Sequence, residues 1–401
     1  MHRRVVVVGA GPVGLTAALA LALQDIPVLV LEAEPALTHD LRAGSYHPPT
    51  LDMLAPLGVT EEMLARGLRV RRWQFRDRRE GLIVEWDLGL LAGDTAFAFR
   101  LHLEQHRLTP ILLGKLRALP HVEVLFSHPV RHVSQDEGAV RVTCGTPGGE
   151  APFAGEWLIG ADGGHSVVRK ALATEFEGFT WPERNVIIST PYDLEQHGFA
   201  YNTYIADPQE WAGLFKVPHD GPPGLWRIGF PVPDAETDEH ALSEQGVQQR
   251  LRRLLPWRES YEVAYRSIYR VHQRVARDWR RGRILIAGDA AHLNNPVGGM
   301  GLNGGIHDAV NLAEKLGRVW RGEADQGLLD LYVKQRRTAN VEFIQEGSIR
   351  NKRNLEERDE ATRRRRHDEL RAMAADPERA RQFLLGTSMI ASVRRSESIT
   401  A

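Results

Sequence analysis

The residues of this chain that could do chemistry stand in three glycine-bearing stretches, at residues 9–14, 160–169 and 288–305. Acidic side chains accompany them, with Glu32 after the first stretch and Asp289 inside the third. Glycine lets backbone N–H groups approach a ligand closely, and a helix that begins there directs its positive end towards an anion. The first and third stretches therefore predict a cradle for a large cofactor. The second, taken alone, fits any turn between a strand and a helix.

The first stretch has the spacing of a dinucleotide-binding turn. A run of valines precedes Gly9, Gly11 and Gly14, an Ala/Leu segment typical of a helix follows, and a second apolar run ends at Glu32. In such a unit the first glycine makes the turn, the second lets a pyrophosphate touch the backbone, and the third lets the helix pack on the strand. The acidic residue is placed to bind ribose hydroxyls. The pattern predicts a bound dinucleotide without separating NAD from the adenosine half of FAD.

The third stretch needs a strand and a helix to hold it. A buried strand over residues 284–287 precedes the acidic turn Gly288-Asp289, and five glycines lie between Gly298 and Gly305 before an amphipathic helix. A flexible surface loop would need neither the strand before it nor the helix after it. We therefore expect this stretch to bind the same cofactor as the N-terminal turn.

Composition narrows the class of protein. The chain has 401 residues, 42% of them hydrophobic, and a net charge of −1, which fits two or three globular domains and gives no electrostatic case for a nucleic-acid or membrane partner. The single cysteine, Cys144, excludes an intrachain disulfide and favours a reducing, cytoplasmic location. The apolar N-terminus could pass for a signal peptide, but its glycines and prolines suit two strands around one helix. A monomer or homodimer is expected.

Together, three ordered motifs resemble those of the class A flavoprotein monooxygenases, the aromatic-hydroxylase family typified by 4-hydroxybenzoate hydroxylase. They are GAGPVG at Gly9, GADGGHSVVR at Gly160 and GDAAHLNNPVGGMGLNGGIHDAVNLAEKL at Gly288, and the resemblance covers about residues 4–345. It implies tightly but non-covalently bound FAD, with NADH or NADPH as the reductant. It also implies hydroxylation of a small phenol-like or heteroaromatic substrate with O2, through a flavin C4a-hydroperoxide.

The resemblance also assigns roles to individual residues. The resemblance implies that the ADP part of FAD is held by Gly9, Gly11, Gly14 and Glu32, and that the flavin nucleotide is contacted by Arg42 and Gln105. It also implies that Asp162 belongs to a motif shared by FAD and NAD(P)H and that Asp289 contacts the ribityl or pyrophosphate region. By the same resemblance, the loop along the isoalloxazine contains Gly299, Gly301, Leu302 and Asn303, and the backbone of Pro296 faces the reacting flavin edge. The chain departs from the family at Asn295-Pro296, where two prolines are common. We expect that departure to alter one wall of the substrate pocket.

Hydroxylation requires the protein to exclude water and to favour the ionised form of a phenol, whose reference pKa is about 10 on the tyrosine model. His47 and Tyr204 are the preferred candidates to assist ionisation, ahead of Tyr201 and His197. Tyr201 is also a candidate for substrate binding, and Arg227 is a candidate anchor for a substrate carboxylate, which arginine binds bidentately. Two alternatives stay open: His47 as a surface histidine before two prolines, and Arg227 as a solvated arginine on a strand.

The predicted fold class is α/β, a Rossmann-like FAD-binding domain of the glutathione-reductase type with an inserted antiparallel-sheet substrate domain and a helical C-terminal tail. We assign residues 1–70, 97–177 and 270–345 to the FAD-binding domain, 71–96 and 178–269 to the substrate domain, and 346–401 to C-terminal helices. The tail lacks the length and the cysteines of the thioredoxin-like extension found in the phenol-hydroxylase branch. Arg363–Arg366, preceded by acidic residues, is interpreted as a solvated helix face.

Three other functions remain compatible with a flavin fold. A flavin-dependent halogenase would need a lysine soon after the first strand-helix-strand unit, but no lysine precedes Lys115, and residues 226–231 match the halogenase tryptophan motif poorly. An isoprenoid reductase or desaturase would need a long apolar tunnel. A non-catalytic flavin-binding protein would not need the complete set of motifs.

Overall fold

A six-stranded sheet forms the core of the first lobe in the computed structural model, which describes residues 3–39 and 43–400. Its strand order is β18-β19-β12-β1-β2-β8. The strands are β1 (Val5–Val8), β2 (Val28–Leu31), β8 (Val122–Leu125), β12 (Trp157–Gly160), β18 (Arg280–Arg281) and β19 (Ile284–Ile286). All neighbours pair in parallel except β18 with β19. The central strands are almost wholly apolar because helices cover both faces of a parallel sheet.

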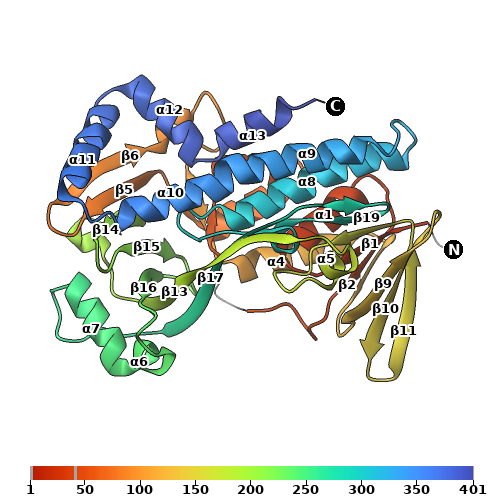
Figure 1. Cartoon of the computed structure of the whole chain (residues 1–401), viewed down its shortest axis with the longest axis horizontal. Coiled ribbons are helices and arrows are strands. Elements are labelled where there is room, and N and C mark those ends of the chain that lie inside the picture. The colour runs from red at the N-terminus through yellow and green to blue at the C-terminus, as the bar shows by residue number, and fades with distance from the viewer. Residues whose placement is uncertain (1–2, 40–42, 401) are drawn as a thin grey trace.

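Helices and two small sheets complete the first lobe (Figure 1). The helices are α1 (Pro12–Ala22), α2 (Pro48–Leu54), α3 (Thr60–Arg66), α4 (Gln105–Arg117), α5 (Val167–Ala171) and α8 (Gly301–Trp320). One small sheet joins β3 (Ser45–Tyr46), β7 (Arg100–His102) and β4 (Leu68–Val70), and the other joins β9 (Val130–Gln135), β10 (Val140–Thr146) and β11 (Gly149–Gly155). α1 packs against both α4 and α8, so the first glycine motif and the third are brought together.

An eight-stranded sheet forms the second lobe, in the order β20-β17-β13-β16-β15-β14-β5-β6. Its strands are β5 (Arg72–Asp77), β6 (Gly81–Asp87), β13 (Phe176–Thr190), β14 (Asn202–Ala206), β15 (Ala212–Val217), β16 (Leu225–Val232), β17 (Tyr265–Ala276) and β20 (His292–Leu293). All pairings are antiparallel except β14 with β5. The proposed domain boundaries at 177/178 and 269/270 fall inside β13 and β17, which therefore connect the two lobes.

Alternation along β16 shows how the eight-stranded sheet divides its faces. Trp226, Ile228 and Phe230 belong to a hydrophobic cluster with residues of α6 (Asp238–Leu242) and α7 (Glu244–Leu254). Arg227 lies between them in sequence, so its side chain projects from the opposite face, because successive strand residues alternate. Only that opposite face can contribute side chains to a site shared with the first lobe.

One almost continuous helical rod crosses from the first lobe to the C-terminal segment (Figure 1). It consists of α9 (Leu328–Ala339), a π-helical stretch (Asn340–Gln345) and α10 (Glu346–Leu355). The proposed boundary at 345/346 therefore falls within unbroken helix. In the π-helical stretch, the Gln345 side chain bonds to that of Gln273 and to the carbonyl of Leu293, which ties the rod to the second lobe.

The C-terminal helices α11 (Glu360–Ala374), α12 (Pro377–Thr387) and α13 (Ile390–Glu397) pack on the rest of the chain rather than forming a separate tail: α11 and α12 cover β5, β6 and the turn after β6, and α13 lies along α9. Asp376 caps α12, since its carboxylate accepts hydrogen bonds from the N–H groups of Glu378 and Arg379. The solvated interpretation of Arg363 is wrong, because this side chain is buried and pairs with the buried carboxylate of Asp77. A helix face that packs on a sheet needs partners for its charges, and Asp77 supplies one.

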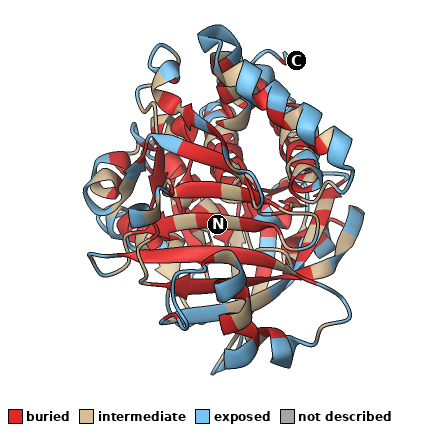
Figure 2. Ribbon diagram, turned by 90° about the vertical axis from the view of Figure 1, so that its left-hand side faces the viewer, coloured by how far each residue is buried: buried red, intermediate tan, exposed pale blue. Residues whose placement is uncertain are grey.

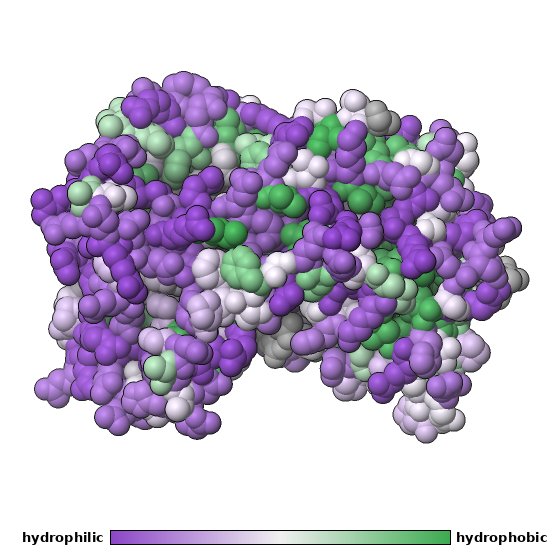
Figure 3. All heavy atoms as spheres, viewed as in Figure 1, coloured by the Kyte–Doolittle hydropathy of each residue, from purple (hydrophilic) through white to green (hydrophobic). Residues whose placement is uncertain are grey.

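The strands of both sheets are buried, and the exposed residues lie mainly on outer helix faces and loops (Figure 2). The face shown in Figure 3 is largely hydrophilic, with hydrophobic side chains showing between the polar ones and a notch between the lobes at the lower edge. No helix within the described ranges is both long enough and apolar enough to cross a bilayer.

Candidate active site

The three motifs meet at one edge of the six-stranded sheet. β19, β12 and β1 are neighbours, with Val8 level with Gly160 and Gly160 level with Ile286. Each strand ends immediately before its motif, at Gly9, Asp162 and Gly288-Asp289. In α/β proteins, ligands bind outside the carboxyl ends of parallel strands. The sheet therefore assembles, in one place, stretches that are far apart in the sequence.

The glycines of the first motif divide into two that pack and one that faces open space. Gly9 has φ +105°, and a Cβ there would lie 2.4 Å from the carbonyl oxygen of Ala161. At Gly14 a Cβ would lie 2.0 Å from the carbonyl oxygen of Gly9. At Gly11 an added Cβ would have no described atom within 4 Å. The space beside Gly11 is where a pyrophosphate can touch the backbone, in front of the N-terminus of α1.

The acidic turn of the third motif is positioned by a buried carboxylate. Gly288 has φ +60° and donates its N–H to Asp308 Oδ2 at 3.1 Å. Asp308 also binds His292 at 2.7 Å and Arg336 at 2.8 Å. Burial raises the pKa of Asp308, but the charges of His292 and Arg336 outweigh that effect and hold it below its usual value. This buried network fixes the turn so that Asp289 is exposed at the cofactor edge.

Asp162 serves the backbone around the second motif. Its carboxylate accepts hydrogen bonds from the hydroxyl of Ser166 at 2.5 Å and from the N–H groups of Val167 and Val168. It therefore caps α5 and shapes the turn that packs against Gly9. Arg169, on α5, donates to the carbonyl of Ala290 at 2.9 Å and links this motif to the third.

The remaining candidates for the adenosine side are only partly described. Glu32 follows β2, as predicted, and accepts hydrogen bonds from the N–H groups of Ala10 and Glu34. Gln105 is the first residue of α4 and is half-buried. Arg42 lies outside the described residues.

Asn303 ties the glycine loop to the segment that carries His47. Its amide oxygen accepts from the His47 N–H at 2.8 Å and the Thr50 hydroxyl at 2.7 Å. Its amide nitrogen donates to the carbonyls of Ser45 and Gly299. With four hydrogen bonds to protein groups, the Asn303 side chain holds the loop. Only its backbone, with Gly301 and Leu302 in the first turn of α8, remains for a cofactor.

His47 is a buried, neutral imidazole, not the surface histidine left open as an alternative. Burial, reinforced by the charge of Arg100, holds the pKa of His47 well below its usual value. Nε2 lies 2.9 Å from the carbonyl oxygen of Gly298, which can only accept, so Nε2 carries the proton. Nδ1 is therefore an acceptor, and it has no partner in the described part of the chain.

Tyr204 holds the other side of the loop. Its hydroxyl oxygen accepts from the N–H of Gly298 at 3.0 Å, so Gly298 is bound by both Tyr204 and His47. Pro296 is exposed at the start of this loop. Asn295 is buried and accepts from the N–H of Val297 at 3.1 Å. Its side chain stabilises the turn that presents Pro296.

Arg100 is a site residue that sequence reasoning missed. It lies on β7 with 2% of its surface exposed, and its Nε and Nη1 atoms have no hydrogen-bond partner within residues 3–39 and 43–400. Its charge interacts with His47 and Tyr204, and its guanidinium lies 5.4 Å from the ring centre of Trp73. Buried charged groups almost always have partners, so unpartnered donors here indicate a place for an anion.

Two predicted substrate residues lie elsewhere. The hydroxyl of Tyr201 donates to Glu195 at 2.9 Å, and its ring packs 6.0 Å from Trp226, on the face of the sheet that α7 covers. Tyr201 thus packs in a different cluster from Tyr204, which lies with Trp73 and Trp86. His197 also lies apart, stacked on Trp257 at 3.6 Å.

Arg227 is buried rather than solvated, with 1% of its surface exposed. Burial lowers its pKa to about 10, and the groups that act on it electrostatically are Tyr269, Glu104 and Tyr265. Its guanidinium lies 5.2 Å from the ring centre of Phe215, on the face of the second sheet that is opposite to the one covered by α7. The charge of Arg100 acts on both His47 and Tyr204, so Arg100 lies with the two preferred candidates.

Comparisons with known proteins agree with this geometry. A model of a family described as an FAD-binding domain matches residues 2–346. Para-nitrophenol 4-monooxygenase of Pseudomonas sp. (strain WBC-3) is 37% identical over 388 residues, which cover 95% of this chain and 94% of that protein. 6-hydroxy-3-succinoylpyridine 3-monooxygenase of Pseudomonas putida (strain DSM 28022 / S16) is 38% identical over 363 residues, covering 88% and 89%.

The fold is shared with a solved relative over its full length. The crystal structure of p-nitrophenol 4-monooxygenase from Pseudomonas putida DLL-E4 superposes with a TM-score of 0.92 at 34% identity, covering 100% of this chain and 99% of that one. The chain belongs to the FAD-binding domain family, among the flavin-dependent aromatic monooxygenases. It is thus an FAD-dependent enzyme of this class, and the predicted resemblance, fold class and general function are confirmed.

Proposed function

We propose that this enzyme hydroxylates a small, single-ring phenol or hydroxypyridine, using NADH or NADPH as the reductant. The relatives named for para-nitrophenol and 6-hydroxy-3-succinoylpyridine support this substrate class. In the overall reaction one oxygen atom of O2 replaces a ring hydrogen to give a hydroxyl group. The other oxygen leaves as water, which takes a hydride (two electrons and one proton) from NAD(P)H and one further proton from solvent. Bound FAD supplies the transfer of electrons to O2 and of oxygen to the ring.

The observation that carries this proposal is that Nε and Nη1 of the buried Arg100 guanidinium have no hydrogen-bond partner in the described part of the chain. A phenolate oxygen, or a ring substituent that carries negative charge, satisfies its free N–H groups. The positive charge of Arg100 beside the phenol oxygen favours the ionised phenol, which is the more electron-rich and therefore more reactive form. Arg100 takes the anchoring role that Arg227 was expected to have.

His47 then acts by hydrogen bonding rather than by taking up charge. With a proton on Nε2 and a depressed pKa, it presents Nδ1 as an acceptor at neutral pH. We assign it the orientation of the substrate hydroxyl before that group ionises, while Tyr204 fixes the glycine loop through Gly298. Pro296, Gly299 and Gly301 stay assigned to the flavin side of the site, and Asp162 to positioning the cofactor turn.

The proposal is tested by measuring NAD(P)H oxidation, O2 consumption and H2O2 release across phenols, hydroxybenzoates and hydroxypyridines, with product analysis. We expect a phenol or hydroxypyridine to accelerate NAD(P)H oxidation and to give a hydroxylated product in proportion to NAD(P)H used. Oxidation that yields only H2O2 with every compound would overturn the proposal. Parallel assays with NADH and NADPH decide the reductant.

We further propose that the enzyme works in the reducing cytoplasm, as a monomer or homodimer. Cys144 is a buried free thiol, so this fold needs no disulfide at that position. Burial also raises the pKa of the Cys144 thiol to about 11, which keeps it protonated and unreactive. Light scattering of the FAD-loaded protein measures the oligomeric state directly.

A further inference from the structure

We propose that the turn joining α12 to α13, residues 387–389, together with Phe383, forms a wall of the substrate site and limits the size of the substituent on the substrate ring. This inference rests on the proposed function, because it concerns the site around Arg100. It gives the C-terminal segment a role in substrate selection, in addition to covering the eight-stranded sheet.

The turn touches the proposed anchor directly. Arg100 Nη2 donates to the carbonyl oxygen of Thr387 at 3.2 Å, the only hydrogen bond found for its guanidinium among the described residues. The next residue, Ser388, is fully buried, and its hydroxyl has no hydrogen-bond partner in the described ranges. Arg100 and the residue after its hydrogen-bond partner therefore both carry unsatisfied polar groups in the interior. A polar ligand bound at Arg100 would satisfy the free donors of its guanidinium.

Met389 closes the turn against the glycine loop. It is 1% exposed and forms a small hydrophobic cluster with Met300, which precedes α8, and Ile344 in the π-helical stretch. Its φ of +67° lies in the left-handed region, which is unfavourable for methionine. Such conformations persist where the surrounding structure imposes them, often at ligand sites. The Met389 side chain is thus held against the loop proposed to border the flavin.

Phe383, one turn of α12 before Thr387, extends the wall through aromatic packing. Its ring centre lies 4.3 Å from that of Trp86 and 6.2 Å from that of Trp73. Trp73 in turn meets Tyr204 edge to face at 6.3 Å. An unbroken set of aromatic contacts therefore runs from the residue that binds Gly298 to the C-terminal segment. A phenol anchored at Arg100, which binds Thr387, would therefore be bordered by two large side chains, Phe383 before Thr387 and Met389 after it.

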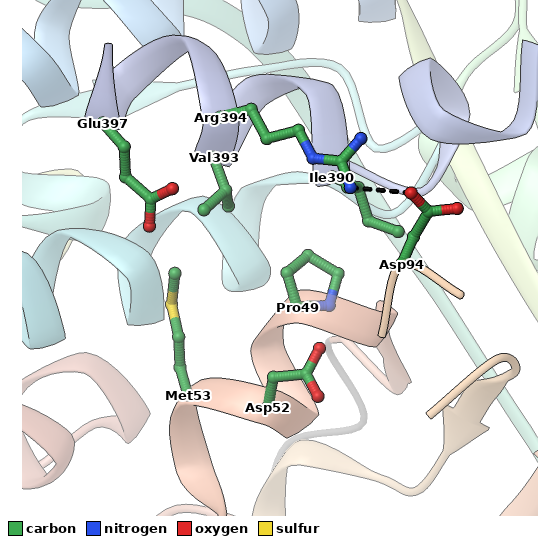
Figure 4. A pocket seen from close by; sticks show the side chains of 8 residues that line it. All are labelled: Pro49, Asp52, Met53, Asp94, Ile390, Val393, Arg394 and Glu397. Atoms are coloured by element: carbon green, nitrogen blue, oxygen red, sulfur yellow. Dashed lines mark hydrogen bonds and ion pairs between the residues drawn. The ribbon is translucent and has the colours of Figure 1, made fainter. Parts of the chain in front are cut away.

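Ion pairs hold this wall in place. Arg381 on α12 and Arg394 on α13 both bind Asp94, each at 2.7 Å, in the loop before β7. Figure 4 shows the Arg394 pair at one end of a pocket of about 280 Å³ between α13 and α2. α2 begins directly after His47, and α13 begins directly after Met389. The two helices that line this outer pocket therefore both begin at the proposed site.

The test compares ligand size in the full-length, FAD-loaded enzyme. Met389→Gly removes the side chain at a φ that glycine adopts freely, and Phe383→Leu shortens the aromatic wall while keeping an apolar residue. 4-Nitrophenol, 4-tert-butylphenol and 4-phenylphenol are titrated into each variant, and binding is followed by the change in flavin absorbance. We expect the affinity ratio of 4-phenylphenol to 4-nitrophenol to rise at least tenfold in one or both variants.

Met373→Ala is the matched control, since Met373 lies on α11 in the same segment and packs on the same aromatic cluster. The control should leave the ratio unchanged. An unchanged ratio in both folded, FAD-containing variants would overturn the inference, and so would an equal rise in the control. If the variants change the affinity ratio as expected but the wild-type enzyme hydroxylates none of these phenols, the proposed function fails while the inference about the wall stands.

Discussion

At the scale of single residues, the site separates positioning from chemistry. The side chains of Asp162 and Asn303 form their hydrogen bonds with protein groups, so they act by shaping the backbone around the ligand. Arg100 and His47 do the reverse, since each keeps buried polar atoms without partners in the described chain. Unsatisfied groups are costly to bury, and their concentration here is what marks the substrate side.

The charge of Arg100 should be measurable on a bound phenol. Arg100→Gln is expected to raise the apparent pKa of enzyme-bound 4-nitrophenol by roughly 1 to 3 pH units, because a nearby cation stabilises the phenolate. The phenolate absorbs visible light, so a pH titration of difference spectra against ligand-free enzyme reports its fraction. Arg72→Gln, on the exposed side of β5, is the control and should not change it. Equal pKa values in wild type and Arg100→Gln would refute the anchor.

At the scale of elements, sequence predicted what is local. The glycine turn after β1 and the strand before Gly288 depend on residues close together in the chain, and both are found. Alternation along the strand already separates Tyr201 from Tyr204, which are three residues apart. Which face of the second sheet meets the first lobe depends on packing between distant segments, which no short motif encodes, and Arg100 carries no motif at all.

The two kinds of glycine in the first motif should respond differently to alanine. Gly9→Ala meets the Ala161 carbonyl at φ +105°, so we expect the apoprotein to lose about 2 kcal/mol or more of its free energy of unfolding. Gly11→Ala meets no described atom, so apoprotein stability should stay within about 0.5 kcal/mol while FAD affinity falls at least tenfold. Denaturation of the apoprotein and FAD titration separate the two effects. Unchanged FAD affinity in Gly11→Ala would contradict the assignment.

At the scale of the whole molecule, buried histidines tie stability to pH. Burial lowers the pKa of His102 to about 4 and that of His307 to about 3. In the unfolded chain both would have the ordinary value of about 6.5, so between that pH and about pH 4 the unfolded state binds protons that the folded state does not. Stability must therefore fall as the solution is acidified below pH 6.5.

We expect the free energy of unfolding to fall by about 2 kcal/mol for each of these histidines when the pH is lowered from 7.5 to 5. Urea denaturation at the two pH values measures the loss. His102→Gln, which can still donate to the Lys216 carbonyl, should lose about 2 kcal/mol less than wild type over this range. His240→Gln, on the exposed helix α6, should match wild type. A pH dependence unchanged in His102→Gln would show that His102 is charged in the folded protein.

The position of the 387–389 turn so late in the sequence has a consequence for how the enzyme is made. All three glycine motifs have been synthesised by residue 305, whereas Arg100 and the glycine loop meet their last wall only when residues 387–389 have left the ribosome. A chain that ended before residue 387 would therefore lack the proposed wall of the substrate site. We expect such a chain to oxidise NAD(P)H with release of H2O2 in place of hydroxylation, which the assays of the proposed function would detect.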